Sequence, residues 1–194
     1  KSDSNATSTY HLLAESLRRG HNNRSHHVGD PSFYKVPFDE LLSKKRTKEF
    51  IKNLSLKKAT PSSKIKPLRV LNESRDTTHY SIIDKDGNAV SNTYTLGYSF
   101  GSGVTIPGTG ILMNNQMNNF AYRYGDKSIE GRVGSPGNRY EPGKRPMSTM
   151  APSMVFNQEG QLVLITGSPG GSYIPAAILR VISGVIDFDL NIGS

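Results

Sequence analysis

The chain has 194 residues, no cysteine, a low hydrophobic content of 35% and a formal net charge of +8 at pH 7. The lack of cysteine excludes disulfide bonds, thiolate metal sites and a cysteine nucleophile. No apolar run approaches the ~18 residues of a membrane span. No charged-then-apolar signal segment opens the chain, so any signal has been removed or lies outside this sequence. We expect one domain of ordinary size with a modest core.

Three helices are predicted in the N-terminal region, over residues 8–21, residues 37–42 and a segment that follows Ser43. The apolar stripe of the first helix consists of Tyr10, Leu13, Ala14 and Leu17. Gly20 and the asparagines after it favour the end of that helix. Ser43 can cap the third helix, which places Phe50, Ile51 and Leu54 on one face and lysines on the other.

A basic run lies between residues 41 and 70, where ten lysines and arginines stand against one acid, Glu49. Such a run could attract nucleic acid. However, Phe50 is its only aromatic residue, and no nucleic-acid-binding motif accompanies it. We therefore favour a solvated surface that is helical and then extended over residues 57–74, and we expect no nucleic-acid partner.

The pattern changes to that of β-structure at Thr77. Residues 78–83 and 89–96 are rich in Thr, Tyr, Ile and Val, and the Asp-Gly within residues 84–88 predicts a tight hairpin. Residues 97–110 are rich in Gly and Ser, so their backbone can approach a ligand or another strand. A short buried strand over residues 111–113 and a group of amides over residues 114–119 follow. These amides could satisfy loop backbone or bind a polar substrate; taken alone, we favour the first.

The C-terminal region predicts a long surface loop, a second hairpin and a helix. The loop covers residues 121–146, and the hairpin strands are residues 154–156 and 162–165. The helix has Pro175 in its first turn and an apolar face that we expect in the core: Ile174, Ala177, Ile178, Val181, Ile182 and Val185. Gly170-Gly171 before this helix places main-chain N–H groups and a positive helix end at one point, which can hold a phosphate or an oxyanion.

Several common catalytic motifs are absent. No Gly-Lys-Ser/Thr follows the glycine turn, no serine has glycines two residues away on both sides, and there is no His-Glu-x-x-His. His26, His27 and His79 lack carboxylates at ligand spacing, so we predict surface or packing roles for them and expect no metal and no cofactor. A hydroxyl nucleophile and a glycine-rich anion site remain, and these are the parts of an acyl-transfer site.

Six motifs, in order and at family-like spacing, resemble γ-glutamyltranspeptidase. They are Thr77-Thr78-His79-Tyr80-Ser81, Asp84-Lys85-Asp86-Gly87-Asn88, Gly110-Ile111-Leu112, Asn114-Asn115-Gln116-Met117, Lys144-Arg145-Pro146-Met147-Ser148 and Thr166-Gly167-Ser168-Pro169-Gly170-Gly171-Ser172. Upstream, residues 29–33 and 58–67 resemble the end of that family's large subunit. The resemblance covers nearly the whole chain.

The resemblance implies an α+β fold, part of the four-layer αββα sandwich of N-terminal-nucleophile hydrolases. It implies a cut between Asp76 and Thr77 by the precursor itself. Residues 1–76 would then be the C-terminal part of the large subunit, helical and then a basic tail. Residues 77–194 would be the N-terminal part of the small catalytic subunit. Family chains are much longer, so we expect this piece alone to be weakly active or inactive, and the whole protein to be periplasmic or secreted.

The implied activity is γ-glutamyl transfer or hydrolysis on glutathione and related γ-glutamyl amides. Thr77 would be the nucleophile, with its freed α-amine, of pKa about 8, as the base. The acyl-enzyme would be released by water or by an acceptor amino acid or peptide. By resemblance Thr95 hydrogen-bonds the nucleophile, and Gly170 and Gly171 form the oxyanion hole, in agreement with the helix-end argument.

The substrate-binding residues also follow from the resemblance. Ser148 and Thr149 match a pair that contacts the substrate α-carboxylate, and Gln116 matches a ligand of the α-amino group. The family often has Asn where this chain has Gly97, and an acid where it has Asn119. Both positions belong to the α-amino pocket, so we expect relaxed γ-glutamyl selectivity, extending to other amide acyl groups.

The lid loop also departs from the family pattern. Glu130 stands where some members have a tyrosine, and Tyr122 and Tyr124 are close in sequence. Two alternatives to the γ-glutamyl enzyme stay open: a catalytically silent relative or fragment that binds a partner, and a basic nucleic-acid-binding module.

Overall fold

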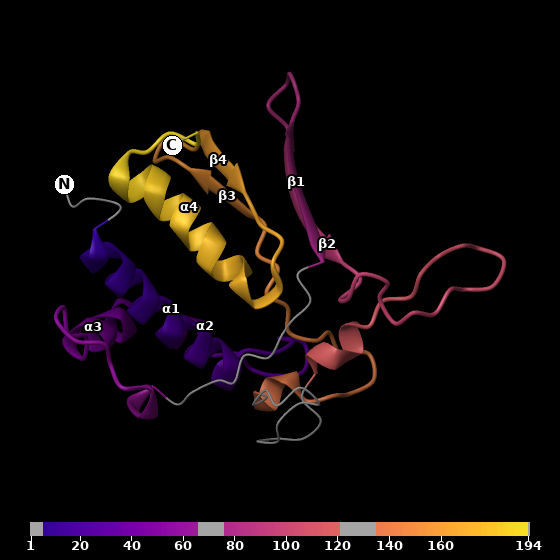
Figure 1. Cartoon of the computed structure of the whole chain (residues 1–194), viewed down its shortest axis with the longest axis horizontal. Helices are drawn as coiled ribbons and strands as arrows, with labels where there is room; N and C mark the ends of the chain where they lie inside the picture. The colour runs from indigo at the N-terminus through magenta and orange to yellow at the C-terminus, as the bar shows by residue number, and fades with distance from the viewer. Residues whose placement is uncertain (1–5, 66–75, 121–134, 194) are drawn as a thin grey trace. The chain divides into compact units, whose positions relative to one another are not determined.

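The computed structural model describes residues 6–65, 76–120 and 135–193 (Figure 1). The chain divides into two compact units. The junction unit consists of residues 72–116 and 148–194, together with Lys1; the N-terminal unit consists of residues 2–71 and 117–147. Each unit therefore combines segments that are far apart in the sequence. Helices and strands both occur, as an α+β fold requires.

Two antiparallel hairpins form the strands of the junction unit. β1 (Thr77–Ile83) pairs with β2 (Ala89–Thr95), and β3 (Ser153–Phe156) pairs with β4 (Leu162–Thr166). The four strands confirm the predicted hairpins to within about one residue at their ends. In the first hairpin Thr77 lies opposite Thr95.

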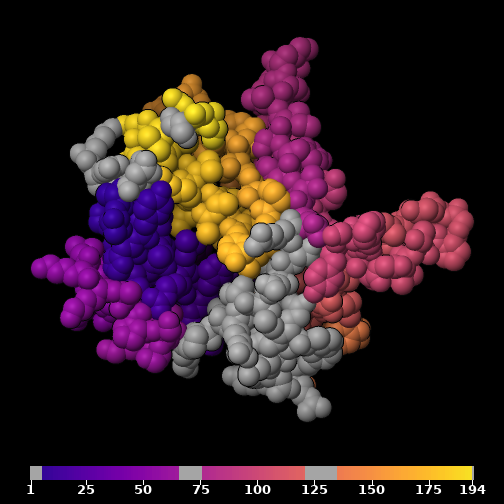
Figure 2. Space-filling view, in the orientation of Figure 1, coloured from indigo at the N-terminus to yellow at the C-terminus, as the bar shows by residue number. Residues whose placement is uncertain are grey.

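The turn of the first hairpin is built as the Asp-Gly signal predicts. The N–H of Asp84 donates to the carbonyl of Asn88 at 3.0 Å, and Gly87 has a φ of 84°. The Asp84 carboxylate accepts a bond from the Asn88 side chain, which is the largest cause that lowers the pKa of this carboxyl. The tip of the hairpin extends beyond the surface of β3, β4 and α4 (Figure 2), and Ile82 and Ile83 near it are exposed.

The second hairpin carries the clearest helix. After β4 a short 3-10 turn, η4 (Gly171–Tyr173), leads into α4 (Ile174–Phe188). The core of this unit includes Leu164, Ile174 and Ile178, which are all buried. Of the predicted core face, Val181, Ile182 and Val185 are half-buried. Ala177 is exposed, so its prediction was wrong; its small side chain lies at the edge of the stripe.

The same helix corrects the statement that no segment of the chain approaches the length of a membrane span. Residues Gly171–Phe188 have a mean hydropathy of 1.3 and are long enough to cross a membrane by length and composition alone. Polar residues lie between the apolar ones, so reading uninterrupted runs overlooked it. In the structure α4 contacts β4, and 28% of this stretch is buried.

The predicted strand over residues 111–113 is not formed as a buried strand. Only an isolated bridge joins Thr105 and Leu112, and the side chains of Ile111 and Met113 are exposed. This segment pairs locally with residues 102–106, and no further strand among the described residues extends the pairing. Residues 111–113 therefore form a single bridge and not a strand of a sheet.

The N-terminal unit is mainly helical. Its elements are α1 (Thr7–His27), α2 (Phe38–Leu41), α3 (Lys44–Lys52), η1 (Ser62–Lys64) and η3 (Pro136–Asn138), while η2 (Gln116–Asn119) straddles the boundary of the two units along the chain. The predicted short helix at 37–42 and the Ser43 cap are confirmed, because the Ser43 hydroxyl accepts a bond from the Arg46 N–H at 3.1 Å.

The first helix differs from its prediction in length and in its buried face. It continues through Gly20 to His27, and the Val28 N–H closes it on the Arg24 carbonyl at 3.0 Å. A single glycine weakens a helix but does not end it when the following residues keep the hydrogen bonds. The predicted apolar stripe is wrong, because the buried residues are polar: Thr9, Glu15, Arg19 and Ser25.

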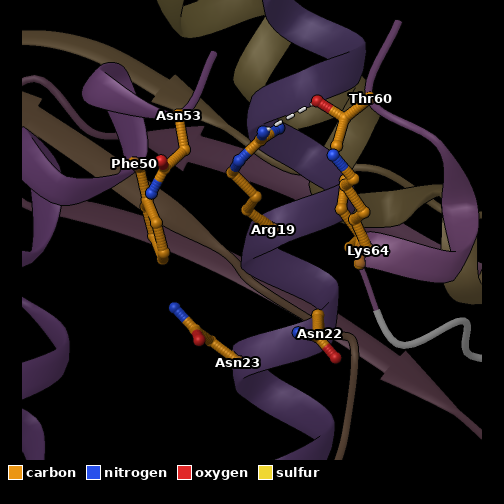
Figure 3. A pocket seen from close by; sticks show the side chains of 8 residues that line it. Arg19, Asn22, Asn23, Phe50, Asn53, Thr60 and Lys64 are labelled. Carbon is orange, nitrogen blue, oxygen red and sulfur yellow. Dashed lines mark hydrogen bonds between the residues drawn. The ribbon is translucent and has the colours of Figure 1, made fainter.

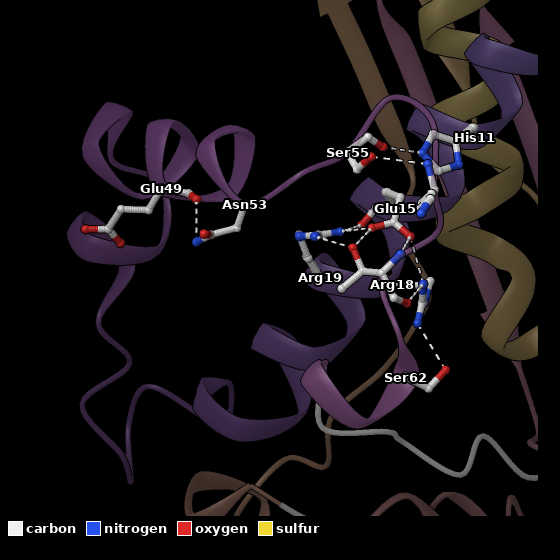
Figure 4. Close-up of polar contacts among 10 residues, drawn as sticks. His11, Glu15, Arg18, Arg19, Glu49, Asn53, Ser55 and Ser62 are labelled. Atoms are coloured by element: carbon white, nitrogen blue, oxygen red, sulfur yellow. Dashed lines mark hydrogen bonds and ion pairs between the residues drawn. The ribbon is translucent and has the colours of Figure 1, made fainter.

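A buried carboxylate organises this polar face (Figure 4). Glu15 is 2% exposed and accepts bonds from Arg18 at 2.8 Å, Arg19 at 2.5 Å and both the N–H and hydroxyl of Thr60. Burial alone would raise its pKa, but the bonds from Thr60 and Arg19 outweigh it and lower the pKa to about 2. Thr60 lies in the predicted surface tail, so part of that tail is tied to α1.

The remaining loops are partly as predicted. The lysines of the basic run that the structure describes are exposed, in line with a solvated surface. The long loop over residues 121–146 is not wholly a surface segment, since Ser135 and Asn138 are buried. Residues 66–75 of the tail, and the lid residues Tyr122, Tyr124 and Glu130, lie outside the described residues.

Candidate active site

The candidate site is centred on the uncut bond between Asp76 and Thr77. Thr77 is the first residue of β1, and pairing places Thr95 of β2 directly opposite. The Thr95 hydroxyl donates to the main-chain carbonyl of Asp76 at 3.0 Å and accepts from the Gly97 N–H at 2.9 Å. A hydroxyl donor thus lies on the carbonyl whose bond we expect to be cut. The resemblance gave Thr95 a bond to the nucleophile, and that role stays a prediction for the processed chain.

Sequence reasoning missed Ser99. Its hydroxyl donates to the carboxylate oxygen Oδ2 of Asp76. Thr95 therefore holds the main-chain carbonyl of Asp76, and Ser99 holds its side chain. Ser99 lies four residues after Thr95, beyond the end of β2, and nothing in the spacing singled it out.

Gly97 and Gln116 lie together beside the end of β2. A Cβ on Gly97 would overlap with the side-chain oxygen of Asn115 and lie 3.4 Å from the Gln116 amide nitrogen, and Gly97 has a φ of 97°. The Asn115 N–H donates to the Leu96 carbonyl at 2.9 Å, which fixes this approach. The structure thus joins two of the predicted α-amino pocket residues.

In the amide-rich segment, residues 114–119, side chains also form hydrogen bonds with the segment's own main chain. The Asn114 side-chain oxygen accepts from the Gln116 N–H at 2.9 Å, as the backbone alternative predicted. Asn119 belongs to the N-terminal unit, where its carbonyl accepts from the Asn138 side chain at 2.6 Å.

The predicted carboxylate-binding pair lies just before β3. The Ser148 hydroxyl accepts from the Met150 N–H at 3.0 Å and is otherwise exposed, and Thr149 is half-buried. A hydroxyl held in a local turn keeps a defined direction, which suits a ligand contact. Both residues belong to the same compact unit as Thr77.

The glycine turn requires glycine at both positions. Gly170 has a φ of 122° and Gly171 a φ of 55°, values that side-chain-bearing residues rarely adopt. The Tyr173 N–H donates to the Gly170 carbonyl at 3.0 Å, so η4 separates the turn from the first residue of α4. The predicted strand, glycine turn and helix are present, with this extra turn between the glycines and the helix.

Two contacts tie the nucleophile hairpin to the strand that leads into this turn. The His79 ring lies so close to Gly167 that a Cβ there would overlap with it. The ring bonds Thr93 through Nδ1 at 2.8 Å, and the Ser91 hydroxyl donates to the Thr166 carbonyl at 3.1 Å. The packing role predicted for His79 is confirmed. These contacts fix β1 and the segment before the glycine turn within one unit.

A separate pocket of about 350 Å³ lies in the N-terminal unit (Figure 3). It is lined by Arg19, Asn22, Asn23, Phe50, Asn53, Thr60, Lys64 and Ile65. Sequence reasoning assigned none of these residues to a site. Within residues 6–65, 76–120 and 135–193, no three His, Asp or Glu side chains gather where a metal ion could bind.

The γ-glutamyltranspeptidase family model matches residues 1–194. The chain is 43% identical over 182 residues to the glutathione hydrolase proenzyme of Escherichia coli (strain K12), covering 93% of this chain and 31% of that protein. It is 36% identical over 187 residues to the acylase ACY 1 proenzyme of Pseudomonas sp. (strain SE83), covering 96% and 31%.

Among solved structures, the γ-glutamyltranspeptidase from Pseudomonas nitroreducens complexed with L-DON is 50% identical and superposes with a TM-score of 0.55. The match covers 59% of each chain. The chain spans about a third of the length of the curated relatives it matches.

Proposed function

Because this chain belongs to the γ-glutamyltranspeptidase family, we propose that it is the processing-junction part of a γ-glutamyl transferase or hydrolase that cuts its own precursor. The relatives named glutathione hydrolase proenzymes support this. The observation that carries the proposal is the 3.0 Å hydrogen bond from the Thr95 hydroxyl to the carbonyl of Asp76.

The cut is proposed to begin at that carbonyl. The Thr77 hydroxyl oxygen bonds to the Asp76 carbonyl carbon, the carbon–nitrogen bond breaks, and the hydroxyl proton ends on the released Thr77 amine. Water then hydrolyses the resulting ester to the Asp76 carboxylate and free Thr77. The carbonyl oxygen gains negative charge in this attack, so a donor already placed on it stabilises the transition state. Thr95 is in position for that role.

Processing creates the group that later turnover needs. A threonine hydroxyl is a weak nucleophile near neutral pH and needs an adjacent base. In the uncut chain the nitrogen of Thr77 is part of a peptide bond, whereas the freed amine, with a pKa of about 8, can accept the hydroxyl proton. Thr77 then attacks the γ-carbonyl of a γ-glutamyl amide, and the leaving amine departs with that proton.

The glycine turn is proposed to hold the oxyanion of this step. The N–H groups of Gly170 and Gly171 would point at the substrate carbonyl oxygen. The contacts of His79 with Gly167 and of Ser91 with Thr166 support this, because they hold the hairpin of β1 and β2, which begins with Thr77, against the strand that leads into the turn. Water or an acceptor amine then releases the acyl group from Thr77.

The substrate pocket is proposed to include Gln116 and Gly97 on the α-amino side and Ser148 and Thr149 on the α-carboxylate side. In the family an acid often stands where this chain has Asn119, so the carboxylate that would pair with the substrate ammonium from this position is missing. The loss of such a partner costs on the order of 2–3 kcal/mol of binding. We therefore propose a second candidate function, an acylase with relaxed γ-glutamyl selectivity, which the relative named acylase ACY 1 proenzyme favours.

Several features of the whole protein are part of the same proposal. They are the four-layer αββα sandwich, a large and a small subunit divided by the cut between residues 76 and 77, and a periplasmic or extracellular location. All three follow from the family resemblance. The two small sheets of the described residues would be parts of the larger sandwich.

The deciding experiment is intact-mass analysis of the full-length protein and two variants. The unaltered chain is expected to give two pieces that separate at Asp76–Thr77, and Thr77→Ala is expected to stay in one piece. Thr77→Ser is the matched control, because it keeps the hydroxyl and should still be cut. An uncut natural chain, or a Thr77→Ala chain cut at the same bond, would overturn the proposal.

Selectivity needs its own comparison. The rate with glutathione is measured against that with a des-amino glutaryl amide, in the natural protein and in Asn119→Asp. We expect the natural protein to accept both and Asn119→Asp to shift the preference toward glutathione. A strong glutathione preference in the natural protein would contradict the acylase alternative.

A further inference from the structure

Two motifs that the proposed reaction does not use bind each other in the N-terminal unit. Residues 29–34 belong to the segment before the proposed cut, and residues 135–145 belong to the segment after it. The Asp30 carboxylate accepts from the Arg145 main-chain N–H at 2.9 Å, from Nε at 3.0 Å and from Nη2 at 2.7 Å. We call the contacts between residues 29–34 and residues 135–145 the 30–145 clamp.

The clamp is centred on a buried acid under an exposed base. The Asp30 side chain is 1% exposed, whereas 71% of the Arg145 side chain is exposed. The Asp30 carboxylate also accepts from the Ser32 N–H at 3.0 Å. Hydrogen bonds from the Arg145 guanidinium, the largest cause, hold the pKa of Asp30 well below its usual range. A two-point guanidinium–carboxylate pair with main-chain support is specific in geometry, even where one partner faces water.

Packing around this pair extends the clamp. The main chains of Gly29 and Gly137 touch so closely that a Cβ on Gly29 would overlap with the Gly137 carbonyl. The Lys144 ammonium lies 5.6 Å from the centre of the Phe33 ring, and its side chain is 1% exposed. A glycine contact, an ion pair and a cation–aromatic contact thus join the same two segments.

The clamp reaches the predicted carboxylate-binding pair through the chain. The Arg145 N–H is held by Asp30, and the Met147 N–H donates to the Asn138 side chain at 2.9 Å. These bonds fix the main chain at two positions immediately before Ser148. The main chain that leads into Ser148 and Thr149 is therefore held by Asp30 of the earlier segment and by Asn138 of the later one.

We propose that the 30–145 clamp is an interface between the two subunits that the cut produces, and that it positions Ser148 and Thr149 for the substrate α-carboxylate. Asp30 and Arg145 are separated by 115 residues, with Thr77 between them. After a cut at Thr77 they lie on different chains, and the N-terminal unit is then joined across them only by non-covalent contacts. This inference rests on the proposed function for the existence of the cut, and assigns Asp30 and Arg145 positioning roles.

The test uses the full-length protein with Asp30→Ala, Arg145→Ala and Arg145→Lys. Size-exclusion chromatography in increasing urea measures how tightly the two pieces associate. We expect Asp30→Ala to weaken association about tenfold, because every bond to the carboxylate is lost. Arg145→Ala keeps the main-chain bond and should weaken it less. Arg145→Lys keeps the charge without the two-point geometry, and reports on the clamp if the alanine variants fail to fold.

The positioning role has a separate readout. With a γ-glutamyl anilide, the KM of Arg145→Ala should rise about fivefold while kcat stays within about twofold, because ground-state binding of the α-carboxylate is lost. With the decarboxylated analogue of the same anilide, KM should not change. An equal KM rise with both substrates would overturn the positioning role.

A matched control separates the clamp from general destabilisation. Glu15 and Arg19 form a buried ion pair in the same compact unit, but both precede Thr77. Glu15→Gln should lower thermal stability without changing KM or selectively separating the pieces. If it separates them as readily as Asp30→Ala does, or if Asp30→Ala leaves association unchanged, the clamp proposal is wrong.

Failure of the cut itself is distinguished by mass analysis. If the natural chain stays in one piece, the proposed function fails and the clamp is still testable. A specific protease site placed before Thr77 then makes the same two pieces, and the urea comparison is repeated. Pieces that stay together naturally and separate in Asp30→Ala support the clamp; pieces that separate equally in both overturn it.

Discussion

Different kinds of contact stabilise the interior of each compact unit. Around the Asp76–Thr77 bond, the contacts of the junction unit come mainly from hydroxyls, main-chain groups and close glycines, such as Thr95 on a carbonyl. The N-terminal unit instead places buried carboxylates, Glu15 and Asp30, under arginines. Neutral donors act through position, whereas ion pairs respond to pH and salt. The proposed chemistry should therefore be sensitive to shape, and the stability of the N-terminal unit to charge.

The largest expected effect is at Thr95. Thr95→Val keeps the shape of the side chain but removes the hydroxyl from the Asp76 carbonyl. Loss of one donor to a developing oxyanion slows a reaction about 100- to 1,000-fold. We therefore expect the cut before Thr77 to slow by this factor, as followed by intact mass against time in the full-length protein.

Thr95→Ser is the control for this change, because it retains the donor and should be cut at nearly the natural rate. If Thr95→Val is cut as fast as the natural chain, the hydroxyl on the carbonyl has no part in processing. The rate of the cut would then depend on the geometry of the junction unit and not on this hydrogen bond.

The next effect concerns charge in the N-terminal unit. The pKa of Glu15 falls from 4.5 to about 2 on folding, despite burial, through bonds from Thr60 and Arg19. This difference corresponds to roughly 3 kcal/mol of stabilisation at neutral pH. We expect Glu15→Gln to lose about 2 kcal/mol in urea unfolding at pH 7, since glutamine keeps part of the hydrogen bonding.

The direction with pH follows from the depressed pKa. The stabilisation from Glu15 is complete above about pH 4.5 and is lost as the pH falls from there toward 2. The natural protein and Glu15→Gln should therefore converge in stability as the pH is lowered through this range. A difference between them that stays constant from pH 7 to pH 3 would show that Glu15 acts through packing and not through its charge.

A smaller effect tests shape in the junction unit. Gly167→Ala places a methyl group where the His79 ring lies. Overpacking of this kind costs roughly 1–2 kcal/mol. Because this strand leads into the glycine turn, we expect kcat of the processed enzyme to fall about tenfold.

The cause of that loss can be isolated with a double-mutant cycle. In a His79→Ala background the methyl group has room, so Gly167→Ala should cost much less than in the natural protein. Equal costs in both backgrounds would mean that the contact between the ring and the glycine does not position the turn.

Local patterns predicted the hairpins, and pairing followed from them. The Asp-Gly turn at residues 84–88 fixes the register of the strands on either side, so a turn centred there places Thr77 opposite Thr95. The sequence could therefore have joined these two residues without the family resemblance. The glycine turn before α4 was equally local, since strand, glycines and helix are consecutive.

Contacts between distant segments could not be predicted in this way. Nothing in the spacing of Asp30 and Arg145 indicates that they meet, because their pairing depends on how the intervening chain folds. The bond from Ser99 to Asp76 has the same origin. The apolar pattern of residues 111–113 misled for a related reason: strand propensity needs a second strand to pair with, and periodicity does not report whether one is present.

The smallest predicted effect tests whether the first helix ends near Gly20, as the sequence pattern predicts, or continues through it, as in the structure. The sequence predicted the end of the first helix there, whereas α1 runs on to His27. In the structure nothing lies within 4 Å of a Cβ on Gly20. Gly20→Ala should then stabilise the protein by about 0.5–1 kcal/mol, through higher helix propensity and a less flexible unfolded chain.

The matched control is Gly29→Ala, just beyond the end of the same helix, where a Cβ would overlap with the Gly137 carbonyl. This change should destabilise the protein in the same urea titration, because a main-chain contact of the clamp has to open. If Gly20→Ala instead lowers stability, the helix ends near Gly20 and the polar face of α1 after that residue is not formed. Opposite signs for the two glycines would show that Gly20 lies within a continuous helix with room for a side chain, whereas Gly29 is needed for its close contact with Gly137.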